Sequence, residues 1–173
     1  EEGYFLAWTT TPWTLPSNVA LCVHPDLEYA KVKAADGNLY ILAVARLDAV
    51  LSGLAKEGEE AYSILETCKG KDLVGLSYEP LYDGAEKEAE RQHKKAHIVV
   101  SDYYVSADDG TGIVHIAPAF GEDDGRIGRE NDLALVKFVD SDGKLTAETP
   151  FFGMRCKPTE KEVAEGAISA VPE

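Results

Sequence analysis

The chain has 173 residues, of which 45% are hydrophobic, and its 31 acidic and 17 basic residues give a formal net charge of -14 at pH 7. This length suits one compact domain with a sizeable core and is short for two. Such a surface repels polyanions, because non-specific nucleic-acid binding depends on lysine and arginine displacing counterions. We therefore expect any nucleic acid to be held locally or by another domain.

The cysteines predict a reducing, cytoplasmic setting. Cys22, Cys68 and Cys156 are odd in number, far apart and without a CxxC pair, which argues against a disulfide framework and against a zinc knuckle. No apolar run has the length that a membrane span needs, so we expect no membrane partner.

The N-terminal quarter of the chain has strand character. Alternating and apolar patterns predict strands at 4–9 and 19–24. The glycine-bearing stretch 34–38 predicts a turn between strands at 28–33 and 39–44. The first 44 residues are therefore expected to form a meander.

Helices and strands alternate in the next part. Leucine and valine spacing predicts a short amphipathic helix at 46–54, and a strand is expected at 62–68. The run 83–95 has almost no apolar residues and is expected to be a surface excursion outside the core, mobile or helical.

The last part is again rich in strands. We expect strands at 97–105, 112–116 and 133–139, and helices at 121–131 and 158–168. Many short strands with a few helices indicate an α+β, β-rich fold whose core is a closed or nearly closed β-barrel decorated with short helices, because closure removes exposed strand edges.

The stretch TTTPWTLPSN, residues 9–18, combines strand-favouring threonines with two prolines that end a hydrogen-bonded ladder. Threonines at a strand end are usually cross-strand pairs or turn formers. Three in a row before a rigid turn also suit a site that needs a cluster of hydroxyl groups. The sequence leaves both interpretations open.

The stretch GTGIVHIAPAFGEDD, residues 110–124, has the features of one wall of a pocket. Its glycines allow close backbone approach, and Pro118 ends an apolar strand that contains His115. A histidine in such a strand is more often a hydrogen-bonded core residue than a ligand. The acids at 122–124 also suit the positive N-terminus of a helix.

Metal and nucleophilic chemistry are disfavoured. His115 and the acids at 122–124 are suitable atom types, but no second histidine has metal-ligand spacing. The loop starting at Asp140 lacks the glutamate that a calcium loop needs at its twelfth position, where Phe151 stands. No GxSxG motif occurs, so the available groups suit the positioning of a water and a cationic substrate.

Together the two stretches resemble the editing (CP1) domain of isoleucyl-tRNA synthetases. Thr11-Pro12-Trp13 and His115 favour the isoleucine branch over the valine and leucine enzymes, and the continuation PSNVALCVHP resembles the eukaryotic-type enzymes. The resemblance implies that residues 1–173 are a single editing domain excised from a larger synthetase, with 83–95 as a lineage-variable surface segment. The HIGH and KMSKS motifs of the synthetic site are absent from this sequence.

The resemblance implies hydrolytic proofreading of valyl-tRNA(Ile), with valyl-adenylate as a second candidate substrate and no cofactor or metal. The partners implied are the 3′ end of the tRNA and the rest of the parent synthetase. The residues implied as catalytic are Thr10, Thr11 and Asp124, and those implied as substrate-binding are Thr9, Trp13, Thr14, Asn18, His115 and again Asp124.

Two other functions stay open at this point. The chain can be a module that binds an aminoacyl-tRNA end or an adenylate without hydrolysing it when separated from its parent. It can also be a free-standing barrel that binds an unrelated amine-containing ligand, although two linked motifs disfavour that.

Overall fold

A computed structural model describes residues 3–157, which fall into two compact units. Unit 1 comprises residues 3–9, 20–78 and 98–115, and unit 2 comprises 10–19, 79–97 and 116–157. The expected helix at 158–168 lies outside the described residues. That residues 1–173 form a single editing domain stays a prediction.

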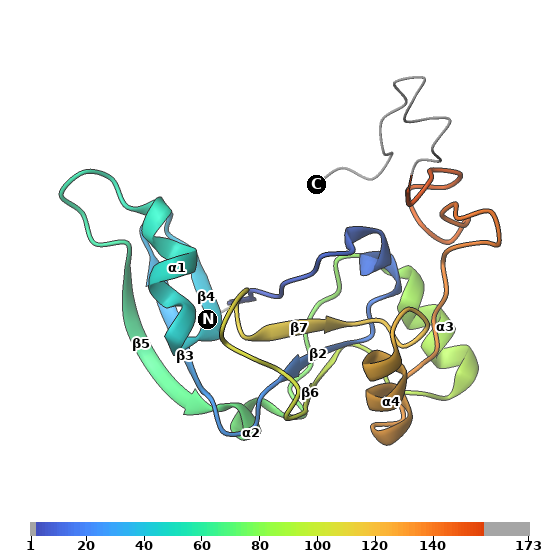
Figure 1. Cartoon of the computed structure of the whole chain (residues 1–173), viewed down its shortest axis with the longest axis horizontal. Helices are drawn as coiled ribbons and strands as arrows, with labels where there is room; N and C mark the ends of the chain where they lie inside the picture. The colour runs from blue at the N-terminus through green and yellow to red at the C-terminus, as the bar shows by residue number, and fades with distance from the viewer. Residues whose placement is uncertain (1–2, 158–173) are drawn as a thin grey trace. The chain divides into compact units, whose positions relative to one another are not determined.

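The described elements are short strands with short helices between them (Figure 1). The strands are β1 (Tyr4–Phe5), β2 (Ala20–Val23), β3 (Glu28–Ala34), β4 (Leu39–Ala43), β5 (Tyr62–Lys69), β6 (Ile98–Ser101) and β7 (Ile113–Ile116). The α-helices are α1 (Leu47–Leu51), α2 (Gly70–Leu73), α3 (Gly84–Gln92) and α4 (Glu122–Glu130), and the 3₁₀ helices are η1 (Pro12–Ser17), η2 (Val44–Arg46) and η3 (Ser52–Leu54).

The expected hairpin is confirmed and the expected meander is wrong. Strands β3 and β4 pair antiparallel, with Tyr29 opposite Ala43 and Lys33 opposite Leu39, and Gly37 takes a positive φ of 91° in the turn. However, β1 pairs parallel to β4, and β2 belongs to a different sheet. Consecutive order in the chain therefore does not give the pairing order.

The described strands form two open sheets, which corrects the expectation of a closed or nearly closed barrel. One sheet has the order β1-β4-β3-β5 and the other has the order β6-β2-β7. Both are visible as separate ribbons in Figure 1. The fold is α+β, as expected, but each of these sheets has two edge strands. Strand propensity predicted the strands and could not predict closure, which depends on the pairing of the first and last strands.

Two apolar clusters form the core of unit 1. In one of them, Leu47 and Leu51 of α1 pack with Val32 and Leu42 of the four-stranded sheet. These leucines are the i and i+4 positions of the predicted amphipathic helix, so its buried face is confirmed at these two positions, whereas Leu54 at the end of the predicted helix is exposed. The other cluster is built around the fully buried Tyr29.

The strand expected at 133–139 is not formed, although its alternation of buried and exposed residues is. Side chains take the place of a partner strand there. The amide of Gln92 donates to the Leu135 carbonyl and accepts from the Leu135 N–H, both at 2.9 Å. The hydroxyl of Ser17 accepts the Phe138 N–H at 3.1 Å. The backbone groups are therefore satisfied without a ladder.

The segment 83–95 contains α3. Ala85 and Ala89 are buried on one face of this helix, whereas Glu86, Lys87 and Glu90 are exposed. The helix ends at His93, which adopts the left-handed conformation with φ 53°.

A substitution at Gly112 tests how closely the chain approaches β4 there. Its φ is 76°, and a Cβ built on it would lie 2.4 Å from the Cβ of Ala43. We expect Gly112→Ala to lower the free energy of unfolding, measured by urea denaturation, by about 1–2 kcal/mol for the left-handed backbone and by about 1–3 kcal/mol more for the overlap.

Gly37→Ala is the matched control. Gly37 has a φ of 91° and nothing within 4 Å of its built Cβ, so it should show only the backbone effect. Equal losses in the two variants would contradict a close approach of Gly112 to Ala43.

Candidate functional site

The first motif ends in a tight 3₁₀ turn. The Thr11 carbonyl accepts the Thr14 backbone N–H at 3.0 Å and the Thr14 hydroxyl at 2.8 Å. The hydroxyl oxygens of Thr11 and Thr14 lie 3.3 Å apart. Pro12 opens η1, where its missing N–H is not needed. Thr14 is therefore a buried turn former, while Thr10 is exposed to solvent and Thr11 is half-buried.

Trp13 lies on the same turn and is half-buried. The Lys157 ammonium lies 4.8 Å from the centre of a Trp13 ring, within the range of a cation–π interaction. This face of the indole therefore already contacts a cation.

The two motifs meet at one peptide group in unit 2. The carbonyl of Ile116 accepts the Val19 N–H at 3.0 Å and the Asn18 side-chain amide at 3.4 Å. The N–H on the other side of the same peptide bond, that of Ala117, donates to Asp124 Oδ2 at 2.8 Å. The end of the first motif and the acid at the end of the second are therefore joined through the Ile116–Ala117 peptide.

Asp124 is a partly buried carboxylate at the start of α4. Desolvation raises the pKa of Asp124, and the hydrogen bond from Ala117 opposes that rise. A carboxylate can accept about four hydrogen bonds. Asp124 therefore keeps acceptor capacity for a further donor while its own position is fixed by the backbone.

Helix α4 presents Asp124 because its glycines let it approach a turn. A Cβ built on Gly128 would lie 2.9 Å from the Pro118 ring, and one built on Gly125 would lie 3.3 Å from the Pro118 carbonyl oxygen. Acids in the first turn and Arg129 in the last suit the helix dipole. The helix expected at 121–131 is thus confirmed, and its acids lie in the first turn.

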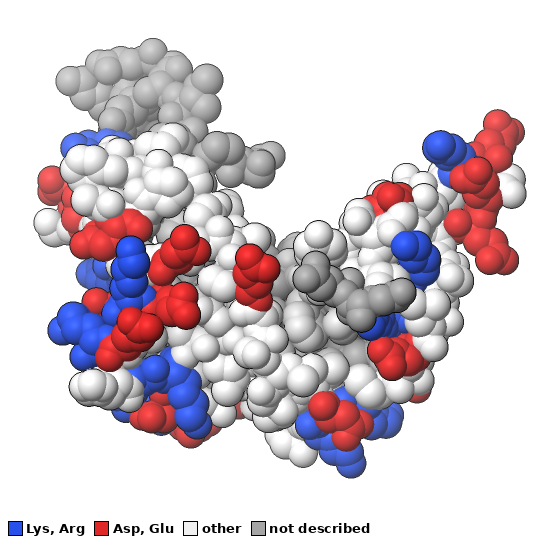
Figure 2. All heavy atoms as spheres, turned by 180° about the vertical axis from the view of Figure 1, so that it is seen from behind, with Lys and Arg blue, Asp and Glu red and all other residues white. Residues whose placement is uncertain are grey.

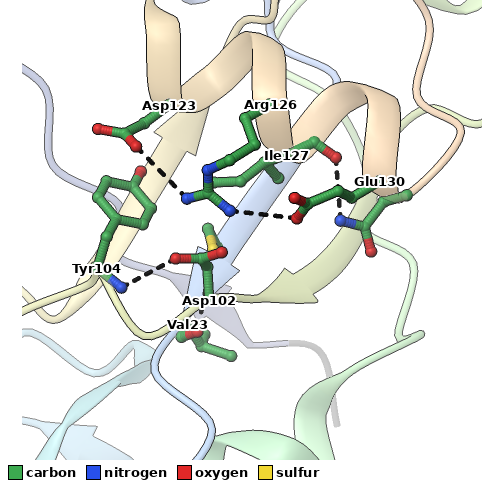
Figure 3. Close-up of polar contacts among 9 residues, drawn as sticks. Val23, Asp102, Tyr104, Asp123, Arg126, Ile127 and Glu130 are labelled. Atoms are coloured by element: carbon green, nitrogen blue, oxygen red, sulfur yellow. Dashed lines mark hydrogen bonds and ion pairs between the residues drawn. The ribbon is translucent and has the colours of Figure 1, made fainter.

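Arg126 on α4 lies between Asp123 and Glu130, as Figure 3 shows. Its guanidinium nitrogens are 3.4 Å from the Asp123 carboxylate and 3.1 Å from that of Glu130. The face in Figure 2 likewise shows basic side chains lying among acidic ones. Asp123 therefore belongs to an exposed ion-pair row, unlike its neighbour Asp124.

His115 and Thr9 lie in unit 1. The His115 side chain is in β7 and is only 6% exposed. Burial lowers the pKa of His115 from 6.5 to about 4, so its imidazole is neutral at pH 7. Thr9 is half-buried and directly follows Trp8, which bridges to Val114 of β7. The remaining expected site residues all lie in unit 2.

Two hydrogen bonds that hold the second motif were not predicted from the sequence. The Ala117 N–H has no sequence signature, because any residue except proline supplies it. Tyr29, whose hydroxyl donates to the Gly112 carbonyl at 2.6 Å, had a signal: a tyrosine on the buried face of a predicted strand needs a partner for its hydroxyl.

Three further features of the described residues bear on other kinds of function. Within residues 3–157, no group of three or more histidine, cysteine or acidic side chains is arranged to hold a metal. A cavity of about 550 Å³ in unit 2 lies against α3, Phe138, Glu148 and Pro150 and is lined by none of the expected site residues. Among the helices in that range, none is long and apolar enough to cross a bilayer.

The fold resembles that of a leucyl-tRNA synthetase editing domain. The P. knowlesi cytosolic leucyl-tRNA synthetase editing domain aligns with a TM-score of 0.53 at 21% identity, over 73% of this chain and 51% of that one. No family model matches the chain.

The sequence comparison gives isoleucine–tRNA ligases as relatives. The chain is homologous to isoleucine–tRNA ligases over most of its length: it is 43% identical to that of Treponema denticola over 95% of the chain and 44% identical to the cytoplasmic enzyme of Saccharomyces cerevisiae over 93%. It spans 16% and 15% of the length of these two relatives. Because bacterial and yeast relatives are about equally similar, the eukaryotic-type assignment stays a prediction.

The buried neutral His115 predicts a pH-dependent stability. Between pH 6.5 and about 4 the unfolded histidine binds a proton and the folded one does not. The free energy of unfolding should therefore fall as the pH falls through this window, by up to about 1.4 kcal/mol per pH unit for this one group.

His115→Gln should lack this contribution, so the difference in stability between the two proteins should change with pH by that amount in urea titrations. His97, whose pKa is also lowered by burial, and Asp124 are present in both proteins and cancel in the difference. Parallel pH dependences of the two proteins would contradict a neutral, buried His115.

Proposed function

We propose that the chain is the hydrolytic editing domain of an isoleucyl-tRNA synthetase and that it deacylates valyl-tRNA(Ile), with valyl-adenylate as a further substrate. The observation that carries this is the homology to isoleucine–tRNA ligases across a chain in which the hydroxyl-rich motif and Asp124 are joined through one peptide group. The fold likeness to a leucyl-tRNA synthetase editing domain supports it.

The proposed hydrolysis adds selectivity that binding of the amino acid alone does not provide. Isoleucine and valine differ by one methylene, and burial of a methylene gives only about 1–3 kcal/mol of discrimination, a general figure for which this amino-acid pair is the standard example. A hydrolytic site that accepts valine and excludes isoleucine by size supplies the missing selectivity.

Asp124, in its ionised form, holds the α-ammonium of the aminoacyl group. A charge-assisted hydrogen bond in a partly dry setting is strong and directional. Its bond from Ala117 fixes one oxygen, and its raised pKa is of the kind that a cationic ligand would bring down again. This contact distinguishes an aminoacyl ester from other esters.

His115 limits the size of the acyl side chain. A neutral imidazole, which its low pKa supports, does not repel the substrate ammonium as an imidazolium would. Its burial supports a fixed wall rather than a mobile one. Trp13, which is half-buried in the 3₁₀ turn of the first motif, contributes through its backbone region and apolar surface.

Thr10 and Thr11 align the ester and the attacking water. The water attacks the carbonyl carbon, the bond to the ribose oxygen breaks, and the proton from the water passes to that oxygen. The neighbouring ribose hydroxyl activates the water, so the protein supplies alignment rather than a strong base. Thr9, Thr14 and Asn18 orient the terminal adenosine or support the turn, and the contacts of Thr14 and Asn18 favour support.

The rest of the parent enzyme delivers the tRNA. With a net charge of -14 and basic side chains such as Arg126 and Arg91 already paired with acids, the chain has few cations with which to neutralise phosphates. We therefore expect weak activity in isolation. We also expect a cytoplasmic location, together with the parent enzyme.

Asp124→Asn tests the ammonium contact. Asparagine keeps an acceptor for the Ala117 N–H but loses the charge, so deacylation of valyl-tRNA(Ile) should fall by about 10- to 100-fold. The measurement is the release of labelled valine, with folding checked by circular dichroism.

Asp123→Asn is the control for Asp124→Asn. It removes the neighbouring charge from an exposed ion pair and should change the rate by less than about twofold. Full activity of Asp124→Asn would rule out the ammonium role.

His115→Ala tests the size limit. Removing the ring should raise hydrolysis of isoleucyl-tRNA(Ile) by about tenfold, the lower end of what one methylene is worth, and should leave hydrolysis of valyl-tRNA(Ile) nearly unchanged. His115→Gln, which keeps most of the volume, should stay selective. Isoleucyl-tRNA(Ile) that remains as stable with His115→Ala as with the wild type would exclude this role.

The same assays separate hydrolysis from simple binding. A chain that binds valyl-tRNA(Ile) or a valyl-adenosine analogue, yet leaves the ester intact, would be a binding module rather than an editing enzyme.

A further inference from the structure

The start of the second motif is held by an anchor of three consecutive carbonyl groups in unit 1. The Gly110 carbonyl accepts Arg46 Nε at 2.9 Å, and that of Thr111 accepts the Ala43 N–H at 3.0 Å. The Gly112 carbonyl accepts the Tyr29 hydroxyl at 2.6 Å. Three donors from β3, β4 and η2 thus fix the three residues that precede β7.

Tyr29 is a fully buried donor to this anchor, and its hydroxyl has a defined direction. It donates to Gly112 and accepts the backbone N–H of His24 at 2.9 Å, and its side chain is 0% exposed. Burial raises the pKa of Tyr29 to about 12. The hydroxyl therefore remains a donor at every pH at which an ester hydrolase would be assayed.

The anchored peptide directly precedes β7. Gly112 has a positive φ and sits against Ala43, and β7 begins at the next residue. Side chains along a strand alternate between faces, so a rotation of the Gly112 peptide would tilt the side chains that follow. His115 is three residues further on, in the same short strand.

We infer that Tyr29 is a positioning residue for selectivity. By holding the Gly112 carbonyl, its hydroxyl fixes β7 and with it how far the His115 ring reaches toward the acyl side chain of the substrate. This inference rests on the proposed function, in which His115 sets the size limit. Tyr29 itself does not touch the substrate.

Tyr29→Phe is the direct test, because phenylalanine keeps the ring in the core and removes only the hydroxyl. Hydrolysis of isoleucyl-tRNA(Ile) relative to valyl-tRNA(Ile) should rise by about three- to tenfold, the effect of one buried hydrogen bond. The His115 ring resonances in a ¹H–¹³C NMR spectrum should shift. A merely structural role would lower both rates together and leave their ratio unchanged.

Tyr40→Phe is the matched control. Tyr40 lies on β4 of the same sheet, but its hydroxyl donates to Asp36 in the exposed hairpin turn at 2.6 Å. It should change neither the ratio nor the His115 resonances. Arg46→Ala removes the donor to Gly110 from a half-buried position and should shift the ratio in the same direction even if Tyr29→Phe folds poorly.

The outcomes separate the two claims. A wild-type chain that leaves valyl-tRNA(Ile) intact contradicts the proposed function, and the NMR shifts then decide alone whether Tyr29 positions His115. An active wild type whose ratio is unchanged by both Tyr29→Phe and Arg46→Ala overturns the inference about Tyr29. A changed ratio with an unchanged Tyr40→Phe control supports it.

Discussion

The local arrangement of the candidate site depends on one backbone peptide. The Ile116–Ala117 group accepts hydrogen bonds from Asn18 and Val19 on its carbonyl side and donates to Asp124 on its amide side. A buried peptide group must have partners, so the same requirement that stabilises the fold brings the end of one motif to the acid of the other. Losing the Asp124 bond would leave the buried Ala117 N–H without this acceptor, whereas the Ile116 carbonyl has two donors.

Burial moves the two ionisable candidates in opposite directions. It raises the pKa of Asp124 and lowers that of His115, because in each case the charged form is disfavoured. Burial therefore shifts both side chains toward their neutral forms. The exposed acids around Arg126 show no such burial, which separates Asp124 from its neighbours by environment rather than by residue type.

Local signals predicted the local structure. The β3–β4 hairpin followed from its glycine turn, the buried face of α1 from leucine spacing, and α4 from its acidic first turn. Long-range contacts could not be predicted in this way. No local sequence pattern indicates the parallel pairing of β1 with β4 or the use of the Gln92 side chain in place of a strand at Leu135. For the site, the motifs predicted the candidate residues. They could not predict the backbone group that joins Asn18 to Asp124, because it has no side-chain signature.

The glycines of α4 carry a further meaning. Each glycine within a helix disfavours that helix by about 1 kcal/mol relative to alanine, and α4 contains Gly125 and Gly128 in only nine residues. An isolated peptide of this sequence would be mostly random coil, so the helix exists because it leans on Pro118. The position of the Asp124 carboxylate is consequently conditional on the fold: a truncated or unfolded copy of the chain would retain the residue but lose its placement.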